Sequence, residues 1–126
     1  MEPIIHLGNE VEILKTSFSA VGKSIIIHEW KGSGPPYLHV HYQDDEAWHI
    51  LEGELTFQFI NRQVIVSKGA TVFVPAGVAH TYFEHHGTSR YLIILTPRLN
   101  DLIAELQKAK LSMHGEIMKK YYSDIL

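Results

Sequence analysis

Between residues 24 and 96 the chain repeats short stretches in which apolar residues cluster or alternate with polar ones. Short runs that are rich in Val, Ile, Thr, Tyr and Phe and end at Gly, Pro, Asn or Asp are typical of β-strands. The pattern predicts strands over residues 24–30, 37–42, 46–60 (two strands), 63–66, 71–74, 79–84 and 91–95. The first 23 residues read as irregular, with one candidate strand around Glu10–Leu14.

The breaks between these runs have the composition of tight turns. Glu52-Gly53 divides residues 46–60 into a hairpin, because such a turn needs a positive φ that glycine adopts without strain. Further turns are expected at Lys68-Gly69, Pro75–Gly77 and Gly87–Ser89, with a weaker one at Asn61-Arg62. Short strands with a turn every ten or so residues favour a sandwich or barrel over a parallel α/β sheet.

The pattern changes from strand to helix after residue 96. Thr96-Pro97 is suited to the N-cap and first turn of a helix. Apolar residues then recur at helical spacing, at Leu99, Leu102, Ile103, Leu106 and Leu111. Residues 112–121 predict a second helix, weakened by Gly115. We therefore expect a helical tail over about residues 97–122, after a β core over about 24–95.

Composition limits the classes of protein to consider. A chain of 126 residues without an internal repeat or linker is expected to form a single domain, 1–126. The formal net charge of -3 gives no electrostatic case for nucleic acid or an anionic membrane. The absence of cysteine excludes disulfides and sulfur ligands. No run of apolar residues has the length of a membrane span, so we expect a cytoplasmic protein.

Histidine is abundant, and three of the nine fall into a pattern with metal-ligand spacing. His39 and His41 lie on one face of a predicted strand, because alternate residues of a strand point the same way. Glu46 begins the next strand, and His80 lies in the strand predicted at 79–84. Three imidazoles and one carboxylate suit Fe(II), Mn(II), Ni(II), Co(II) or Zn(II). Four protein ligands can leave coordination positions open, as catalysis requires.

Chance does not explain this pattern well. His-x-His alone is expected roughly 0.6 times in a chain with this many histidines. Requiring Glu46 and Gly53 at their spacings lowers the expectation to roughly 0.003. The second stretch, Gly-x5-Pro-x-Gly-x2-His from Gly69 to His80, is expected roughly 0.002 times. The alternative is that these are ordinary core or surface side chains.

Both stretches resemble the paired motifs of the cupin superfamily, G-x5-H-x-H-x3-4-E-x6-G and G-x5-P-x-G-x2-H-x3-N. The chain departs from them in two places: only four residues, instead of five, separate Gly34 from His39, and Glu84 stands where the family often has Asn. The tail, with TPRLNDLIAEL and MKKYYSDIL, is similar to the C-termini of small quercetin-dioxygenase-like cupins. The resemblance implies an all-β, double-sheet jelly-roll barrel that binds one divalent metal through His39, His41, Glu46 and His80.

Aromatic residues beside the predicted ligands are candidates for substrate contact. Trp48, Phe57, Phe59 and Tyr82 are expected on inward faces. Core filling is enough to explain Phe59, whereas Trp48, Tyr82 and Phe57 are candidates to line a pocket beside the metal. Glu84 is a candidate catalytic base or hydrogen-bond acceptor for a ligand imidazole, with a solvated charge at a strand end as the alternative.

The remaining histidines carry weaker signals. His49 is out of parity with Glu46 and should face away from the metal. We expect a packed or exposed His28 and solvated side chains at His85 and His86; His6 and His114 lie outside the predicted barrel and carry no signal. Asp44 and Asp45 are expected to form a solvated acidic turn.

The sequence therefore leaves three functions open. The first is a metal-dependent oxygenase of small molecules, of the quercetin-dioxygenase-like type. The second is a metal-dependent isomerase of a sugar or keto-enol substrate. The third is a non-catalytic module that binds or senses a small ligand. Open strand edges and the resemblance to small cupins also lead us to expect a homodimer.

Overall fold

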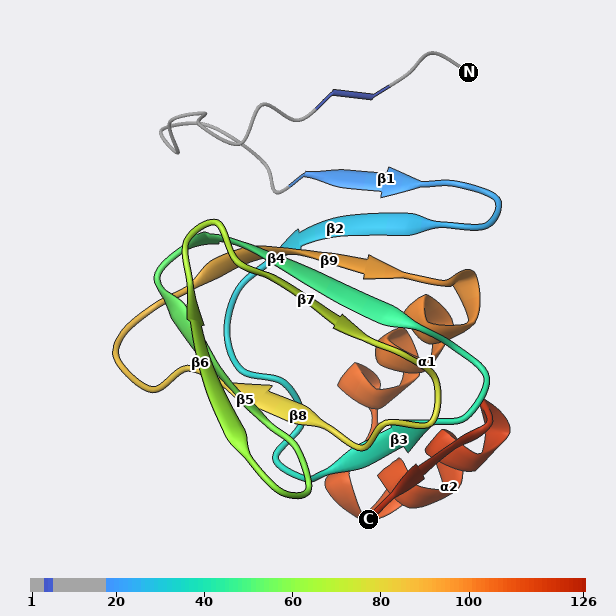
Figure 1. The fold of residues 1–126 in the computed structure, drawn as a ribbon. Helices are drawn as coiled ribbons and strands as arrows, with labels where there is room; N and C mark the ends of the chain where they lie inside the picture. Colours follow the sequence, from blue (N-terminus) through green and yellow to red (C-terminus); the bar gives the residue numbers. More distant parts are fainter. Residues whose placement is uncertain (1–3, 6–17) are drawn as a thin grey trace.

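The computed structural model describes residues 4–5 and 18–126 of the chain (Figure 1). The candidate strand around Glu10–Leu14 lies outside these residues. In chain order the described elements are β1 (Ser19–Val21), β2 (Ile26–Trp30), β3 (His39–His41), β4 (Glu46–Glu52), β5 (Glu54–Gln58), β6 (Gln63–Ser67), β7 (Thr71–Val74), β8 (Thr81–Phe83), β9 (Arg90–Leu95), α1 (Pro97–Lys108), η1 (Leu111–Met113), α2 (His114–Lys120) and β10 (Ser123–Ile125).

The largest sheet has five antiparallel strands in the order β1-β2-β9-β4-β7. In β4 the side chains of Glu46, Trp48 and Ile50 are buried and those between them are less so, as the predicted alternation requires. β1 is a correction, because the sequence analysis expected an irregular segment there. β1 has only three residues, and alternation over so few positions is not a usable signal.

The remaining strands form a three-stranded sheet, β6-β5-β8, and a two-stranded ribbon, β10-β3. The chain is therefore mostly β and antiparallel, consistent with the jelly roll that the resemblance implies, although the described strands form separate sheets that do not close into one barrel. The segment between β2 and β3 contains Pro35 and Pro36, which have no N–H to donate to a neighbouring strand. The predicted strand over 37–42 is correspondingly reduced to 39–41.

The predicted turns lie where expected. Gly53, Gly69, Gly77 and Gly87 all have positive φ. Gly53 is also crowded, because a Cβ there would lie 2.2 Å from the carbonyl oxygen of Thr88. Only glycine meets both requirements at that hairpin.

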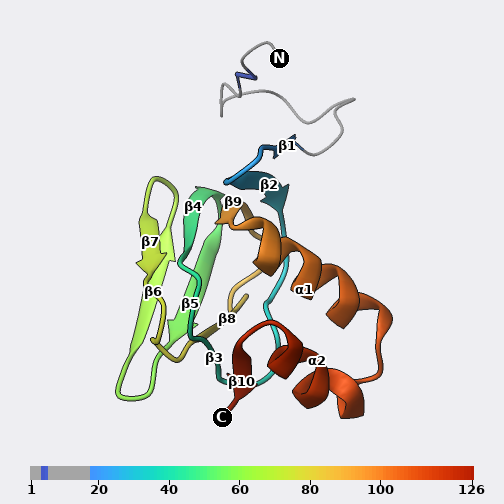
Figure 2. The same ribbon diagram turned by 90° about the vertical axis from the view of Figure 1, so that its right-hand side faces the viewer.

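The helical tail is present, and it covers the side of the sheets opposite the β5–β6 hairpin (Figures 1 and 2). Thr96 caps α1, accepting a hydrogen bond of 3.2 Å from the backbone N–H of Leu99. α1 buries Leu99, Leu102 and Leu106 and α2 buries Ile117 and Met118, although Gly115 weakens that helix. The sequence analysis missed β10, the short strand that follows.

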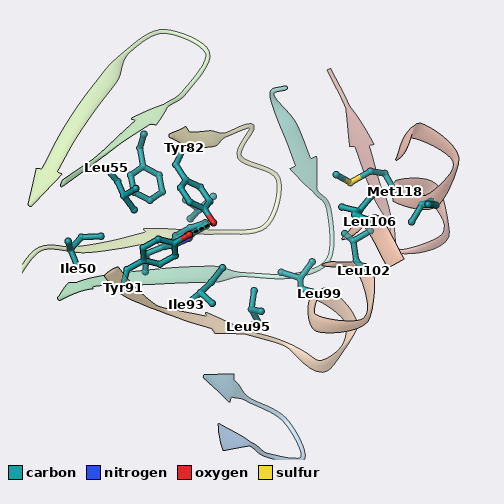
Figure 3. Close-up of a cluster of buried hydrophobic side chains, with 14 residues drawn as sticks. Ile50, Leu55, Tyr82, Tyr91, Ile93, Leu95, Leu99, Leu102, Leu106 and Met118 are labelled. Carbon is teal, nitrogen blue, oxygen red and sulfur yellow. Dashed lines mark hydrogen bonds between the residues drawn. The ribbon is translucent and has the colours of Figure 1, made fainter. Parts of the chain in front are cut away.

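One hydrophobic core joins the sheets to the tail (Figure 3). Ile50, Leu55 and Ile93 from the strands belong to the same cluster as Leu102 and Met118 from the helices. Burial of this apolar surface is the main force that holds the tail against the sheets. Neither described helix has the length and apolar character that a membrane crossing takes.

Candidate metal centre

The four predicted ligands meet at one point inside the molecule. His39 and His41 come from β3, Glu46 from the first residue of β4, and His80 from the residue before β8. Each offers one ligand atom, and these atoms all lie within 4.8 Å of one another. All four side chains are buried.

Backbone pairing brings His80 to β3, although His80 itself is outside a strand. Its N–H donates to the carbonyl of His39 at 2.9 Å, and the N–H of His39 donates back at 3.1 Å. The predicted strand over 79–84 is shortened to 81–83, yet this isolated bridge keeps the imidazoles of His39 and His80 close, with ring centroids 4.4 Å apart.

Each imidazole is oriented through its Nδ1 atom. His39 Nδ1 lies 3.3 Å from the carbonyl oxygen of Tyr37, and His80 Nδ1 lies 2.9 Å from that of Val78. A carbonyl oxygen only accepts, so both Nδ1 atoms carry a proton. His41 Nδ1 lies 2.7 Å from the hydroxyl of Ser123. In their neutral forms, these tautomers leave the Nε2 lone pairs free to bind a cation.

Two Nε2 atoms face the same carboxylate oxygen. Glu46 Oε1 lies 3.0 Å from His80 Nε2 and 3.3 Å from His41 Nε2. A lone pair that faces a carboxylate at this distance is repelled unless a positive charge lies between them, either a proton on the imidazole or a metal ion. The donor set, its tautomers and this arrangement all fit a divalent transition metal.

Burial and neighbouring charges shift the pKa values of the group. Burial, together with the nearby His80 and His41, lowers the pKa of His39 to about 3, against a smaller raising effect of Glu46 and the Tyr37 carbonyl. Burial by itself raises the pKa of Glu46, but hydrogen bonds and attraction from His41 and His80 outweigh it and bring that pKa to about 2. A neutral His39 and an ionised Glu46 are the forms that bind a metal.

Two cavities adjoin this centre. A small one of about 40 Å³ is lined by His39, His41, Glu46 and Trp48 and, from the tail, by residues that include Leu102 and Met118. A larger one of about 240 Å³ lies between the sheets, the 33–37 segment and α1. The two share five lining residues: Pro35, Tyr82, Ile93, Ile103 and Leu106. The two cavities are therefore neighbours, and of the two only the small one is lined by predicted metal ligands.

Trp48 and Tyr82, the leading candidates for substrate contact, both lie at the centre. Trp48 packs edge-on against His80 at 5.7 Å between ring centroids, and against Tyr82 at 5.3 Å. The Tyr82 hydroxyl lies 3.0 Å from that of Tyr91, which donates to the carbonyl of Gly32 at 2.9 Å (Figure 3). Tyr82 therefore donates to Tyr91, and burial raises the pKa of Tyr82 to about 12. Both rings are rigid walls of the site.

Phe57 lies behind these two rings. It is 0% exposed, stacks on Tyr82 at 5.3 Å between centroids, and is absent from the lining of both cavities. Because Phe57 borders neither cavity, its contact with substrate stays a prediction that the structure does not support. Phe57 fills the hydrophobic core. Phe59, for which core filling was expected, is partly buried and packs against the same core.

Glu84 has its hydrogen-bond partners at Ser89 and not among the metal ligands. Its Oε2 accepts hydrogen bonds from the N–H of Ser89 at 2.6 Å and from the Ser89 hydroxyl at 2.7 Å. The carboxylate therefore closes the turn between β8 and β9, so its predicted catalytic role stays a prediction without support from these contacts.

Among the other histidines, His49 faces away from the centre as predicted and contacts the Thr71 hydroxyl at 2.8 Å. His28 packs between Ser19 and Asn100, while His85 and His86 are exposed. His6 lies outside the described residues.

The sequence analysis missed two residues near the site. His114 lines the larger cavity, where its Nδ1 lies 2.7 Å from the Tyr37 hydroxyl. Asp44, expected to be solvated, is buried, with Arg98 Nε 3.5 Å from its carboxylate. Neither residue belongs to a spacing pattern. The folded tail brings Arg98 to Asp44 and places His114 beside Tyr37.

Comparison with known proteins agrees with this geometry. The family model for the cupin domain matches residues 25–96. The chain belongs to the cupin family. A search of curated proteins finds no match to this cupin.

Solved structures show the same fold at low identity. A cupin-2 domain containing protein from Shewanella frigidimarina is 22% identical, with a TM-score of 0.55 over 63% of this chain and 78% of that one. A putative sugar phosphate isomerase from Acidithiobacillus ferrooxidans is 25% identical, with a TM-score of 0.50 over 59% and 51%. The DMSP lyase DddQ from Ruegeria pomeroyi is 21% identical, with a TM-score of 0.51 over 64% and 46%.

Proposed function

We propose that this cupin binds one divalent transition metal through His39, His41, Glu46 and His80, and uses it to catalyse a reaction of a small molecule. The observation that carries the proposal is the placement of two imidazole Nε2 atoms against one carboxylate oxygen, which calls for a cation. Fe, Mn, Ni, Co and Zn all suit this donor set.

The cavities support an enzyme over a simple binding module. A bound metal would supply Lewis acidity toward a substrate oxygen. Trp48 and Tyr82 would orient the substrate beside the metal. Leu102 and Met118, which line the small cavity, would keep water away from the metal ligands. A catalytic site needs an apolar cavity next to the metal in which the substrate is held, whereas a sensing module can bind its ligand in a shallow surface depression.

The lining of the larger cavity favours an uncharged, mainly apolar substrate, and oxygenation of such a molecule is the first candidate. Among the residues that the structure describes, the lining contains no Lys, Arg, Asp or Glu, and its polar side chains include Ser33, Tyr37, Tyr82, Gln107 and His114. A phosphate group would find no cationic partner there. This lining argues against a phosphorylated sugar, although one similar structure is of a putative sugar phosphate isomerase.

Isomerisation of an uncharged keto-enol substrate is the second candidate. The same cavity would accept such a molecule, and the polarised carbonyl oxygen would need no O₂. The two candidates therefore differ in oxygen consumption and not in the site that they require.

Metal content tests the ligand assignment. Elemental analysis of the wild type is expected to show about one transition metal per chain at neutral pH, and His80→Ala is expected to lose most of it, because one of the three imidazole donors is removed while the backbone bridge to His39 is kept. His49→Ala is the matched control, since it removes an imidazole that faces away from the centre. Equal stoichiometric metal in wild type and His80→Ala would refute the assignment.

Oxygen uptake separates the candidate reactions. Fe-, Mn- and Ni-loaded protein would be mixed with a flavonol or an uncharged β-diketone, and O₂ consumption recorded beside metal-free protein. Uptake that depends on the metal supports the oxygenase. If no metal gives uptake, that version is wrong, and solvent deuterium exchange into the β-diketone then tests the isomerase. Saturable binding without either reaction would leave a binding module.

A further inference from the structure

One of the three ligand imidazoles depends on a distant part of the chain. His39 and His80 are each oriented by a carbonyl two residues earlier, at Tyr37 and Val78. His41 is instead oriented by the side chain of Ser123, which lies 82 positions later, at 2.7 Å. The orientation of His41 is therefore decided by how the C-terminal segment docks.

The C-terminal segment docks on β3 as a strand. β10 pairs antiparallel with β3, with Ser123 opposite His41 and Ile125 opposite His39. Two further hydrogen bonds extend the pairing: the N–H of Tyr42 donates to Tyr122 at 2.9 Å, and the N–H of Leu126 donates to Leu38 at 2.9 Å. Both views show β10 alongside β3, after the two helices (Figures 1 and 2).

The direction of the Ser123 hydrogen bonds selects the tautomer of His41. The Ser123 hydroxyl donates to the carbonyl of Tyr121 at 3.1 Å, so its oxygen accepts from His41 Nδ1–H. This leaves Nε2 of a neutral His41 as a lone pair directed at the centre. Ser123 is 2% exposed, so water has little access to replace the hydroxyl if it is removed.

The backbone before Ser123 is held in an unfavourable conformation. Tyr122 has a φ of 55°, which a non-glycine residue adopts at some cost in free energy. Such a conformation persists where surrounding contacts determine it. Here these contacts include the β10–β3 pairing and Arg98, whose guanidinium carbon lies 4.8 Å from the centre of the Tyr122 ring.

We propose that Ser123 is a positioning residue for His41, and that docking of the C-terminal strand and metal binding stabilise each other. The inference rests on the proposed metal site. Linkage makes the effect reciprocal: if docking raises metal affinity by some factor, the metal favours docking by the same factor. Since α2 leads into β10 and its Met118 lines the small cavity, metal binding would also favour the packing of Met118 beside the ligands.

Metal affinity tests the positioning role. The dissociation constant for Co²⁺ would be measured on the full chain by competition with a chromophoric chelator. Ser123→Ala is expected to bind roughly 10–100-fold more weakly, the usual range for a lost hydrogen bond to a metal ligand. Ser123→Thr keeps the hydroxyl and should restore most of the affinity. Asp124→Ala is the comparison variant: it removes contacts of the same strand with Tyr42 and Lys119 but none with His41, so any loss of affinity in it measures strand docking without the Ser123 hydroxyl, and the loss should be smaller than in Ser123→Ala.

Hydrogen exchange tests the coupling between metal binding and docking of β10, and its first measurement needs only the wild type. In the wild type, Co²⁺ is expected to slow exchange of the backbone amides of residues 123–126, and in Ser123→Ala it should slow them less. A purely structural serine would lower thermal stability in Ser123→Ala and leave the Co²⁺ affinity unchanged.

The two proposals fail in different ways. No binding of Co²⁺ or another divalent transition metal by the wild type would overturn the metal site and this inference together. Equal Co²⁺ affinities in wild type and Ser123→Ala, or no metal effect on exchange in β10 of the wild type, would overturn only the inference.

Discussion

At the scale of single residues, the site combines groups that are individually costly to bury. Glu46 and three imidazoles lie almost out of reach of water, and each keeps hydrogen-bond partners or charge partners there. A metal ion would compensate much of this cost, so the metal-free protein should show it as a dependence of stability on pH.

The stability of the metal-free protein should depend on pH through His39 and Glu46, and both residues should lower it as the pH falls. The folded pKa of His39 is about 3 against an ordinary 6.5, so between these values the unfolded chain binds more protons. The folded pKa of Glu46 is about 2 against 4.5, with the same consequence in that lower range. The free energy of unfolding of metal-free protein should therefore fall on acidification, with a loss through His39 of roughly 2 kcal/mol between pH 6.5 and 4.5.

Urea unfolding of metal-free protein at several pH values measures this loss. His39→Gln cannot titrate, so its curve should be flatter than that of the wild type between pH 6.5 and 4.5. Parallel curves for the two proteins would contradict the lowered pKa of His39.

At the scale of elements, the turns are where sequence and backbone geometry correspond most directly. Gly53 and Gly69 both have positive φ, at 72° and 91°, but only Gly53 is crowded by a neighbouring strand connection. Substituting each glycine by alanine therefore separates the cost of a positive φ, present at both positions, from the cost of a steric clash, present only at Gly53.

Alanine at these two positions should have unequal costs. We expect Gly69→Ala to lower the free energy of unfolding by about 1 kcal/mol through φ alone, since nothing lies within 4 Å of the new Cβ. Gly53→Ala should cost more, about 3 kcal/mol, because its Cβ would lie 2.2 Å from the Thr88 oxygen. Chemical denaturation measures both, and equal losses would contradict the crowding argument.

Strand prediction succeeded where runs were long and failed where they were short. β4 and β9 have clear alternation or apolar runs and match the predicted ranges closely. β1 and β10 have three residues each, too few for a pattern, and they form because a partner strand supplies hydrogen bonds.

At the scale of the whole molecule, the helical tail is part of the site. Leu102 is 1% exposed, belongs to the shared core and lines the small cavity beside the metal ligands. The tail therefore contributes both to stability and to the exclusion of water from the centre.

Truncation of Leu102 should show the first of these effects directly. Leu102→Ala is expected to cost about 2–5 kcal/mol, because it removes buried apolar volume and leaves a cavity. Leu111→Ala is the matched control: this residue of the same tail is 60% exposed and should change stability by about 0.5 kcal/mol or less. Thermal denaturation compares the two, and similar losses would show that the tail does not pack as described.

The homodimer, the small-molecule ligand and the cytoplasmic location expected from the sequence stay predictions. Among the described strands, β1 lies at one end of the five-stranded sheet, and this is where a second copy would pair if the homodimer forms.

The sequence by itself determined the ligand types, their spacing and the faces on which they lie, because the period of a strand is local and His39, His41, Glu46 and His80 follow it or flank it. It also determined most strands, turns and helices, which depend on nearby residues. Only the tertiary structure decided that Glu84 closes a turn, that His114 lines a cavity and that Ser123 orients His41. These are contacts of side chains whose partners depend on how distant elements pack, and no local pattern records that packing.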